Sequence, residues 1–125
     1  MGLKLFYGTL TVVPHDAPEL EGSSFVKHAR TAPAYRLFSV DGFPGLVEAP
    51  EGGVAIDVQV WDVPDERWRA LLVDEPPEYY GAAVELEDGR LIETVLAPAD
   101  YVNAGGGVDV SMHGSWRAYK AATSS

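Results

Sequence analysis

The chain has 125 residues, which is enough for one hydrophobic core but too short for two, so a single domain is expected over residues 1–125. It carries 9 Lys and Arg against 19 Asp and Glu, and the resulting net charge of −10 argues against nucleic acid or an anionic membrane surface as a partner. The sequence has no cysteine, no signal-peptide pattern and no run of the ~18–20 apolar residues that a membrane helix needs. Disulfides and cysteine-bound metals are thereby excluded, and a cytoplasmic location is expected.

The first part of the chain predicts strands separated by turns. Residues 3–10 predict a strand that ends near a glycine, and residues 11–24, with two prolines, predict a surface loop. Two further strands are predicted over residues 25–30 and 34–40. Residues 41–46, with the sequence DGFPGL, predict a turn.

The second part predicts the clearest strand, a helix and a hairpin. Residues 54–62 alternate between apolar and mostly polar positions, which is typical of a half-buried strand. A short helix is predicted over residues 64–73, where a proline begins the segment and apolar residues recur at helical spacing. Residues 80–86 and 90–96 predict a hairpin with Asp88-Gly89 as its turn.

The end of the chain predicts a flexible segment and then a helix. Residues 103–107 have the sequence NAGGG and predict a flexible segment, and aromatic residues at helical spacing predict a short helix around Trp116. Trp61, Trp68 and Trp116 are expected to anchor the core. Together the elements predict an α+β fold, a mostly antiparallel sheet, curled or closed into a barrel, with one or two short helices.

The turn at Tyr7, Gly8, Thr9 and Leu10 is the first candidate site. A glycine directly after a strand allows backbone N–H groups to approach a ligand, and successive amides at such a turn can bind a small anion such as a carboxylate. The alternative interpretation is an ordinary turn without a ligand.

The acidic segment after the predicted helix is the second candidate site. Asp74, Glu75 and Glu78 lie beside Tyr79 and Tyr80. Like charges and partial burial raise the pKa of a carboxyl group, which suits it to general acid or base catalysis. The alternative interpretation is a solvated acidic loop.

A metal site is not predicted. His15, Asp16, Glu19 and Glu21 lie in the proline-rich loop, but they lack the repeated spacing of a zinc site. The sequence also has no phosphate loop and no dinucleotide fingerprint, so no cofactor is expected.

Several segments together resemble a known fold family. They are FYGTL at residues 6–10, FPGL at 43–46, VAIDVQVWDV at 54–63 leading into a helix, and an acidic turn before Tyr80. Their order is similar to that of the γ-glutamylcyclotransferase-like (AIG2-like) family. That resemblance implies that Tyr7, Gly8, Thr9 and Leu10 hold the substrate's carboxylate.

For a stand-alone γ-glutamyl cyclotransferase, the same resemblance implies release of 5-oxoproline. Glu75 is then the acid and base, with Asp74 as the other candidate, and Tyr80 lines the pocket.

A second resemblance is longer and more specific. The segments ARTAPAYRLFSV (29–40), GGVAIDVQVWDVP (52–64), VELEDGR (84–90) and GSWRAYK (114–120) resemble the C-terminal domain of allophanate hydrolase, a branch of the same fold. That branch implies decarboxylation of N-carboxycarbamate after an amidase step in urea-type nitrogen metabolism. Arg30 and Arg36 are then candidate partners of the substrate's carboxylates.

The partners implied by these resemblances are a small carboxylate, or a γ-glutamyl or carbamoyl compound, and a separate amidase subunit, because the amidase's Ser-Ser-Lys set is not matched in this chain. A non-catalytic ligand-binding or interaction module of the same fold is the third hypothesis. A homodimer built on the C-terminal helix is also left open.

Overall fold

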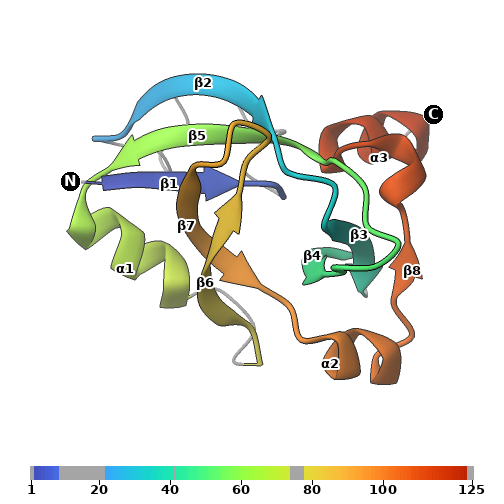
Figure 1. Cartoon of the computed structure of the whole chain (residues 1–125). Coiled ribbons are helices and arrows are strands. Elements are labelled where there is room, and N and C mark those ends of the chain that lie inside the picture. Colours follow the sequence, from blue (N-terminus) through green and yellow to red (C-terminus); the bar gives the residue numbers. More distant parts are fainter. Residues whose placement is uncertain (1, 9–21, 41, 74–77, 124–125) are drawn as a thin grey trace.

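The computed structural model describes residues 2–8, 22–40, 42–73 and 78–123 (Figure 1). Its elements in chain order are β1 (Gly2–Phe6), β2 (Ser24–Arg30), β3 (Tyr35–Val40), β4 (Phe43–Glu48), β5 (Asp57–Val63), α1 (Asp65–Val73), β6 (Tyr80–Glu85), β7 (Leu91–Leu96), α2 (Ala99–Ala104), β8 (Val108–Asp109), the 3₁₀ turn η3 (Ser111–His113) and α3 (Trp116–Thr123).

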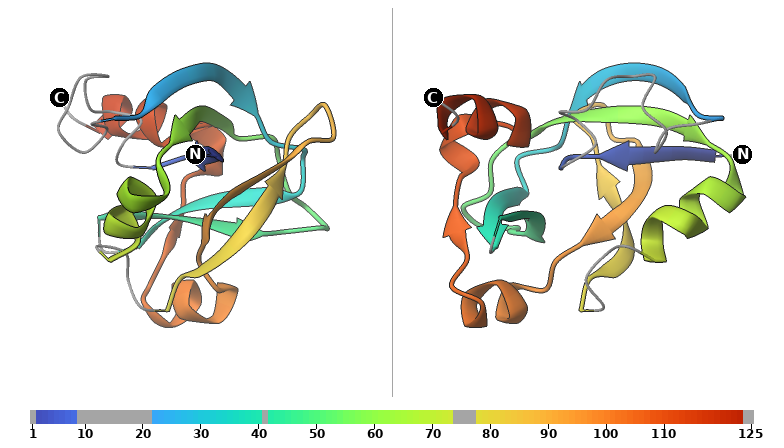
Figure 2. Two further views of the ribbon diagram at one scale, coloured as in Figure 1. Left: turned by 90° about the vertical axis from the view of Figure 1, so that its left-hand side faces the viewer. Right: turned by 180° about the vertical axis from the view of Figure 1, so that it is seen from behind.

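The larger sheet has five strands in the order β2-β5-β1-β7-β6, and all neighbours are antiparallel except β1 and β7, which are parallel. The sheet curls until its two edges meet at one end (Figure 2). There Thr31 forms an isolated bridge with Leu86, and the Ala32 N–H donates to the Glu85 carbonyl at 2.9 Å. The predicted α+β fold with a curled, mostly antiparallel sheet is therefore confirmed.

The smaller sheet has the order β4-β3-β8. The N–H of Ala97, just after β7, donates to the Leu46 carbonyl of β4 at 3.0 Å and so joins the two sheets. Figure 1 shows α1 at the end of the molecule near the N-terminus, whereas α2 and α3 lie beside the smaller sheet.

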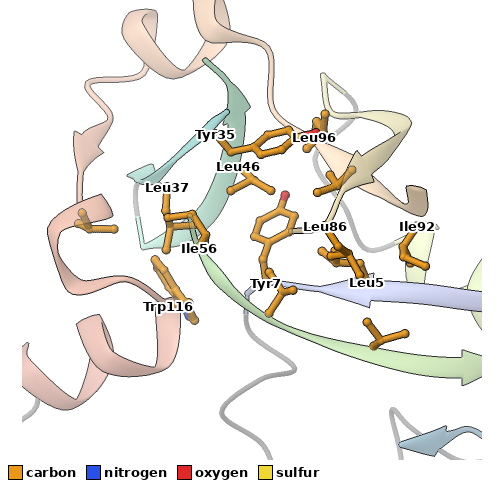
Figure 3. Close-up of a cluster of buried hydrophobic side chains, with 14 residues drawn as sticks. Leu5, Tyr7, Tyr35, Leu37, Leu46, Ile56, Leu86, Ile92, Leu96 and Trp116 are labelled. Carbon is orange, nitrogen blue, oxygen red and sulfur yellow. The ribbon is translucent and has the colours of Figure 1, made fainter. Parts of the chain in front are cut away.

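Two apolar clusters form the core. The first is enclosed by the curled sheet and continues to the smaller sheet and α3, and it includes Leu5, Tyr7 and Trp116 (Figure 3). The second includes Trp61 and packs against Trp68 of α1. All three tryptophans are buried, as the sequence predicts.

The segment predicted as a turn over residues 41–46 is mostly strand. β4 begins at Phe43, and Gly42, with φ of 85°, has the left-handed backbone of a tight turn. Pro44 lies in β4, which is an edge strand of its sheet, so its missing N–H removes no bond from a central ladder. The prediction of a turn was wrong because a proline and a glycine, as in FPGL, occur in turns as well as in edge strands.

The predicted strand over residues 54–62 also begins later, at Asp57. Ahead of it, the Ile56 N–H donates to the Thr31 side chain, and Val54 forms only an isolated bridge with Tyr35. Side-chain and loop contacts therefore replace the regular ladder at these positions.

The predicted flexible segment over residues 103–107 overlaps a helix instead. α2 spans Ala99–Ala104, and Gly107 packs so closely on Val102 that an added Cβ would overlap its side chain. The described residues thus contain three short α-helices, one more than predicted. None of these helices has the length and apolar character needed to cross a membrane.

Candidate functional site

The end of β1 is held tightly to β7. Tyr7 is buried, and its hydroxyl donates to the Val95 carbonyl at 2.6 Å. Two residues before Tyr7, the Leu5 carbonyl accepts a hydrogen bond from the Thr94 hydroxyl at 2.7 Å. Two buried side-chain hydrogen bonds therefore fix the position at which the chain leaves the strand.

Gly8, the next residue, lies directly against the ring of Pro44. A Cβ added at Gly8 would overlap the Pro44 Cγ and lie 3.0 Å from its Cβ. Only glycine fits this contact without displacing the proline. Thr9 and Leu10 lie outside the described residues, so anion binding by this turn stays a prediction.

The tyrosine that reaches this region is Tyr79. Its hydroxyl donates to the Pro44 carbonyl at 2.9 Å, and its ring meets Tyr101 of α2 edge to face at 5.8 Å between centroids. The resemblance to the cyclotransferases implies Tyr80 as the tyrosine that lines the pocket, and two consecutive tyrosines give no sign of which one faces inward. In an extended chain their side chains point to opposite sides, so the register decides.

Tyr80 lies on β6 and is 40% exposed. Its hydroxyl donates to Glu48 Oε1 at 3.1 Å. Partial burial, and then this hydrogen bond to a carboxylate, raise the pKa of Tyr80 above its ordinary value of 10.0. Tyr80 is therefore a neutral hydrogen-bond donor at neutral pH, and its predicted role in substrate binding remains untested.

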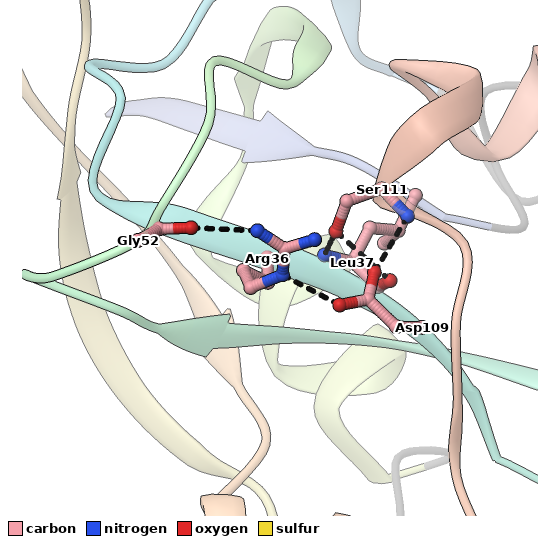
Figure 4. Close-up of polar contacts among 5 residues, drawn as sticks. All are labelled: Arg36, Leu37, Gly52, Asp109 and Ser111. Carbon is pink, nitrogen blue, oxygen red and sulfur yellow. Dashed lines mark hydrogen bonds and ion pairs between the residues drawn. The ribbon is translucent and has the colours of Figure 1, made fainter.

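The two candidate arginines each contact a carboxylate of the same chain. Arg30 Nε lies 2.9 Å from Asp57 Oδ1, and both side chains are more than half exposed. Arg36 lies on β3 in the smaller sheet, where its Nε is 2.5 Å from Asp109 Oδ2 and its Nη1 donates to the Gly52 carbonyl at 2.6 Å (Figure 4). Their binding of a substrate carboxylate stays a prediction.

Asp109 and Ser111 extend the contacts of Arg36 into a network. The Ser111 N–H donates to Asp109 Oδ1 at 2.9 Å, and the Ser111 hydroxyl accepts the Leu37 N–H at 2.8 Å. Burial alone would raise the pKa of Asp109, but the hydrogen bonds from Arg36 and Ser111 outweigh it and lower that pKa. Sequence reasoning missed this network because Arg36 and Asp109 are 73 residues apart.

The remaining candidates fall mainly outside the described residues. Asp74 and Glu75 lie there, and so do His15 and its neighbouring acids. Glu78 is described and exposed. Within the ranges that the structure describes, no group of three or more His, Asp or Glu side chains could hold a metal ion.

Comparison with known proteins identifies the family. The model of the allophanate hydrolase C-terminal domain matches residues 14–121, which is most of the chain. The chain belongs to this family. Its sequence is 29% identical over 107 residues to urea amidolyase from Saccharomyces cerevisiae. The match covers 81% of this chain but only 6% of the yeast protein, so the chain spans a small part of that relative's length.

Solved structures show the same fold. One is the crystal structure of c4763, a uropathogenic Escherichia coli-specific protein, whose sequence is 33% identical to this chain. The two structures align with a TM-score of 0.83 over 96% of this chain and 95% of the other. An AIG2-like protein from Mus musculus is 22% identical, with a TM-score of 0.63 and coverage of 84% and 82% respectively, and so shares the fold. The resemblance to the γ-glutamylcyclotransferase-like (AIG2-like) fold, and to the allophanate hydrolase C-terminal domain in particular, is confirmed.

Proposed function

We propose that this allophanate hydrolase C-terminal domain decarboxylates N-carboxycarbamate, and that the substrate binds at the end of β1. Membership of the family over residues 14–121 is the observation that carries the proposal. The tight packing of Gly8 on Pro44 supports the location, because an immobile backbone is the kind of scaffold that can orient a small ligand.

The reaction requires charge stabilisation and one proton. N-carboxycarbamate carries two carboxylates on one nitrogen; a C–N bond breaks, CO₂ leaves, and the electron pair stays on nitrogen, which takes a proton. The carbamate that remains takes a second proton on nitrogen, from solvent, and loses a second CO₂ to give ammonia. In the proposal the backbone from Tyr7 to Leu10 binds one carboxylate, and Asp74 or Glu75 supplies the proton.

The arginines differ in how easily they could join such a site. The ion pair of Arg30 with Asp57 is solvated, so exchanging Asp57 for a substrate carboxylate costs little. Arg36 would have to leave both Asp109 and the Gly52 carbonyl. The proposal therefore favours Arg30 as the substrate partner. Tyr80 would add a further hydrogen bond by exchanging Glu48 for the substrate.

The proposed partner is an amidase. N-carboxycarbamate has to be produced by cleavage of an amide bond, and the yeast relative carries the matched region within a much longer chain. A separate amidase that supplies the substrate fits both facts.

A titration followed by NMR tests the ligand class. Malonate presents two carboxylates on one carbon, as N-carboxycarbamate presents them on one nitrogen, whereas 5-oxoproline is the product of γ-glutamyl cyclotransfer. We expect malonate to shift the Gly8 amide signal saturably and at lower concentration than 5-oxoproline. Preference for 5-oxoproline would favour the cyclotransferase, and silence from both would contradict the proposed site.

Substitution of Gly8 tests the location. In Gly8→Ala the new Cβ overlaps Pro44, so the backbone at the end of β1 has to move. We expect this displacement of the site to weaken malonate binding about tenfold or more, which corresponds to about 1.4 kcal/mol of binding free energy. Gly81→Ala is the matched control, because a Cβ there meets no atom within 4 Å. The location is wrong if both variants bind malonate as tightly as the wild type.

A further inference from the structure

Pro44 is contacted from two sides by residues that are far apart in the sequence. Gly8 lies against its ring, and Tyr79 binds its carbonyl. The hydroxyl of Tyr79 is thus connected to the end of β1 through a single proline. The rigid ring transmits a displacement of the Pro44 backbone to Gly8 because the contact leaves no space for a Cβ.

The Tyr79 side chain has little freedom to occupy another position. It is 9% exposed, and a Cβ added at Gly45 would come within 2.9 Å of its hydroxyl oxygen and 3.1 Å of the Ala97 Cβ. Tyr101 covers one edge of the ring. A buried phenol that donates one hydrogen bond in this environment holds its acceptor in a defined place.

We infer that Tyr79 is a positioning residue, which sets the geometry of the ligand site at Gly8 by holding the backbone of Pro44. This inference rests on the proposed function, since it assigns Tyr79 a role in binding the same small carboxylate. Tyr79 touches Pro44 and does not itself contact the substrate.

The test is Tyr79→Phe, which removes the hydroxyl and keeps the ring. Loss of one hydrogen bond of ordinary strength should weaken malonate binding about fivefold to tenfold and shift the Gly8 amide signal in the free protein. Tyr101→Phe is the matched control, since it removes a hydroxyl from the neighbouring ring and keeps the edge-to-face contact. It should leave both quantities unchanged.

A double-mutant cycle with Gly8→Ala separates positioning from a general loss of stability. If Tyr79 acts through Gly8, adding Tyr79→Phe to Gly8→Ala should weaken malonate binding less than twofold further, because the contact has already been lost. If Tyr79 only stabilises the fold, the two effects should multiply.

The outcomes distinguish the inference from the function on which it rests. If the wild-type protein binds malonate and the Tyr79→Phe variant binds it equally well, the positioning role is overturned and the proposed function stays intact. Multiplying effects in the cycle also overturn that role. Wild-type protein that binds no malonate overturns the proposed site, and the inference fails with it.

Discussion

Arg36, Asp109 and Ser111 form a polar network between β3 and the segment that leads into α3 (Figure 4). The Ser111 side chain is buried, and its hydroxyl accepts the Leu37 N–H. Because these groups satisfy one another, loss of one partner leaves the others without a hydrogen bond in a partly buried region. The network therefore anchors the C-terminal part of the chain to the smaller sheet.

Asp109 should make stability depend on pH. Its pKa is lower in the folded state than in the unfolded state, so its contribution is present above the unfolded value and is lost as pH falls through the folded value. Asp109→Asn should lower the free energy of unfolding by about 1 kcal/mol at pH 7 and by less at pH 3. The figure allows for solvent screening, because the side chains of the pair are 36% and 32% exposed. Urea unfolding at the two pH values measures this difference.

Asp57→Asn provides the comparison for Asp109→Asn. Asp57 is also paired with an arginine, but both side chains are more than half exposed. An exposed pair contributes little, so we expect a change within about 0.5 kcal/mol at either pH. Equal effects of the two substitutions would show that the network around Asp109 adds nothing beyond a surface ion pair.

Single residues also show how far the sequence alone could lead. The burial of the tryptophans follows from side-chain size, which is a local property. The need for glycine at position 8 comes from the packing of Pro44, which only the tertiary fold brings there. The choice between Tyr79 and Tyr80 depends on strand register, and the pairing of Arg36 with Asp109 depends on tertiary contacts. Such information is absent from local spacing.

Among the elements, the junction of β2 with β6 closes the larger sheet. Thr31 is fully buried, and its hydroxyl accepts the Ile56 N–H at 3.0 Å and donates to the Ala32 carbonyl at 2.9 Å. The period of two in residues 54–62 predicts a strand here. β5 begins only at Asp57, because the N–H of Ile56 binds the Thr31 side chain instead of a neighbouring strand. No periodic pattern in the sequence encodes such a side-chain hydrogen bond.

Thr31→Val tests the closure. Valine has nearly the same shape but no hydroxyl, so the buried Ile56 N–H loses its acceptor, and we expect a loss of about 1–3 kcal/mol in the free energy of unfolding. Thr31→Ser keeps the hydroxyl and should lose about 1 kcal/mol for the missing methyl group. Thermal and urea unfolding compare the variants, and a Val variant as stable as the wild type would show that the side-chain bond does not hold the junction.

At the scale of the whole molecule, order and type of elements could largely be predicted, because hydrophobic periodicity and turn residues report on local structure. The order of the strands in the larger sheet, with β1 between β5 and β7, could not be predicted, because strand pairing joins residues far apart in the chain. The end of β1 therefore gains its neighbours Val95, Pro44 and Tyr79 only through the tertiary fold.

The net charge of −10 bears on the substrate as well. A strongly acidic chain repels a dianion at long range. In the proposed function, binding of N-carboxycarbamate would therefore depend on local donors at the end of β1 and on direct supply from an amidase. Malonate affinity should accordingly be modest and should rise with ionic strength, as salt screens the repulsion.

The most direct test of the account is the decay of N-carboxycarbamate itself. An allophanate-cleaving amidase generates the compound in solution, and ¹³C NMR follows its disappearance with and without this chain. We predict that the chain speeds the decay at least about tenfold, which corresponds to about 1.4 kcal/mol of transition-state stabilisation, and that Gly8→Ala removes the acceleration while Gly81→Ala retains it. An identical decay in the presence and absence of the chain would contradict the proposed function.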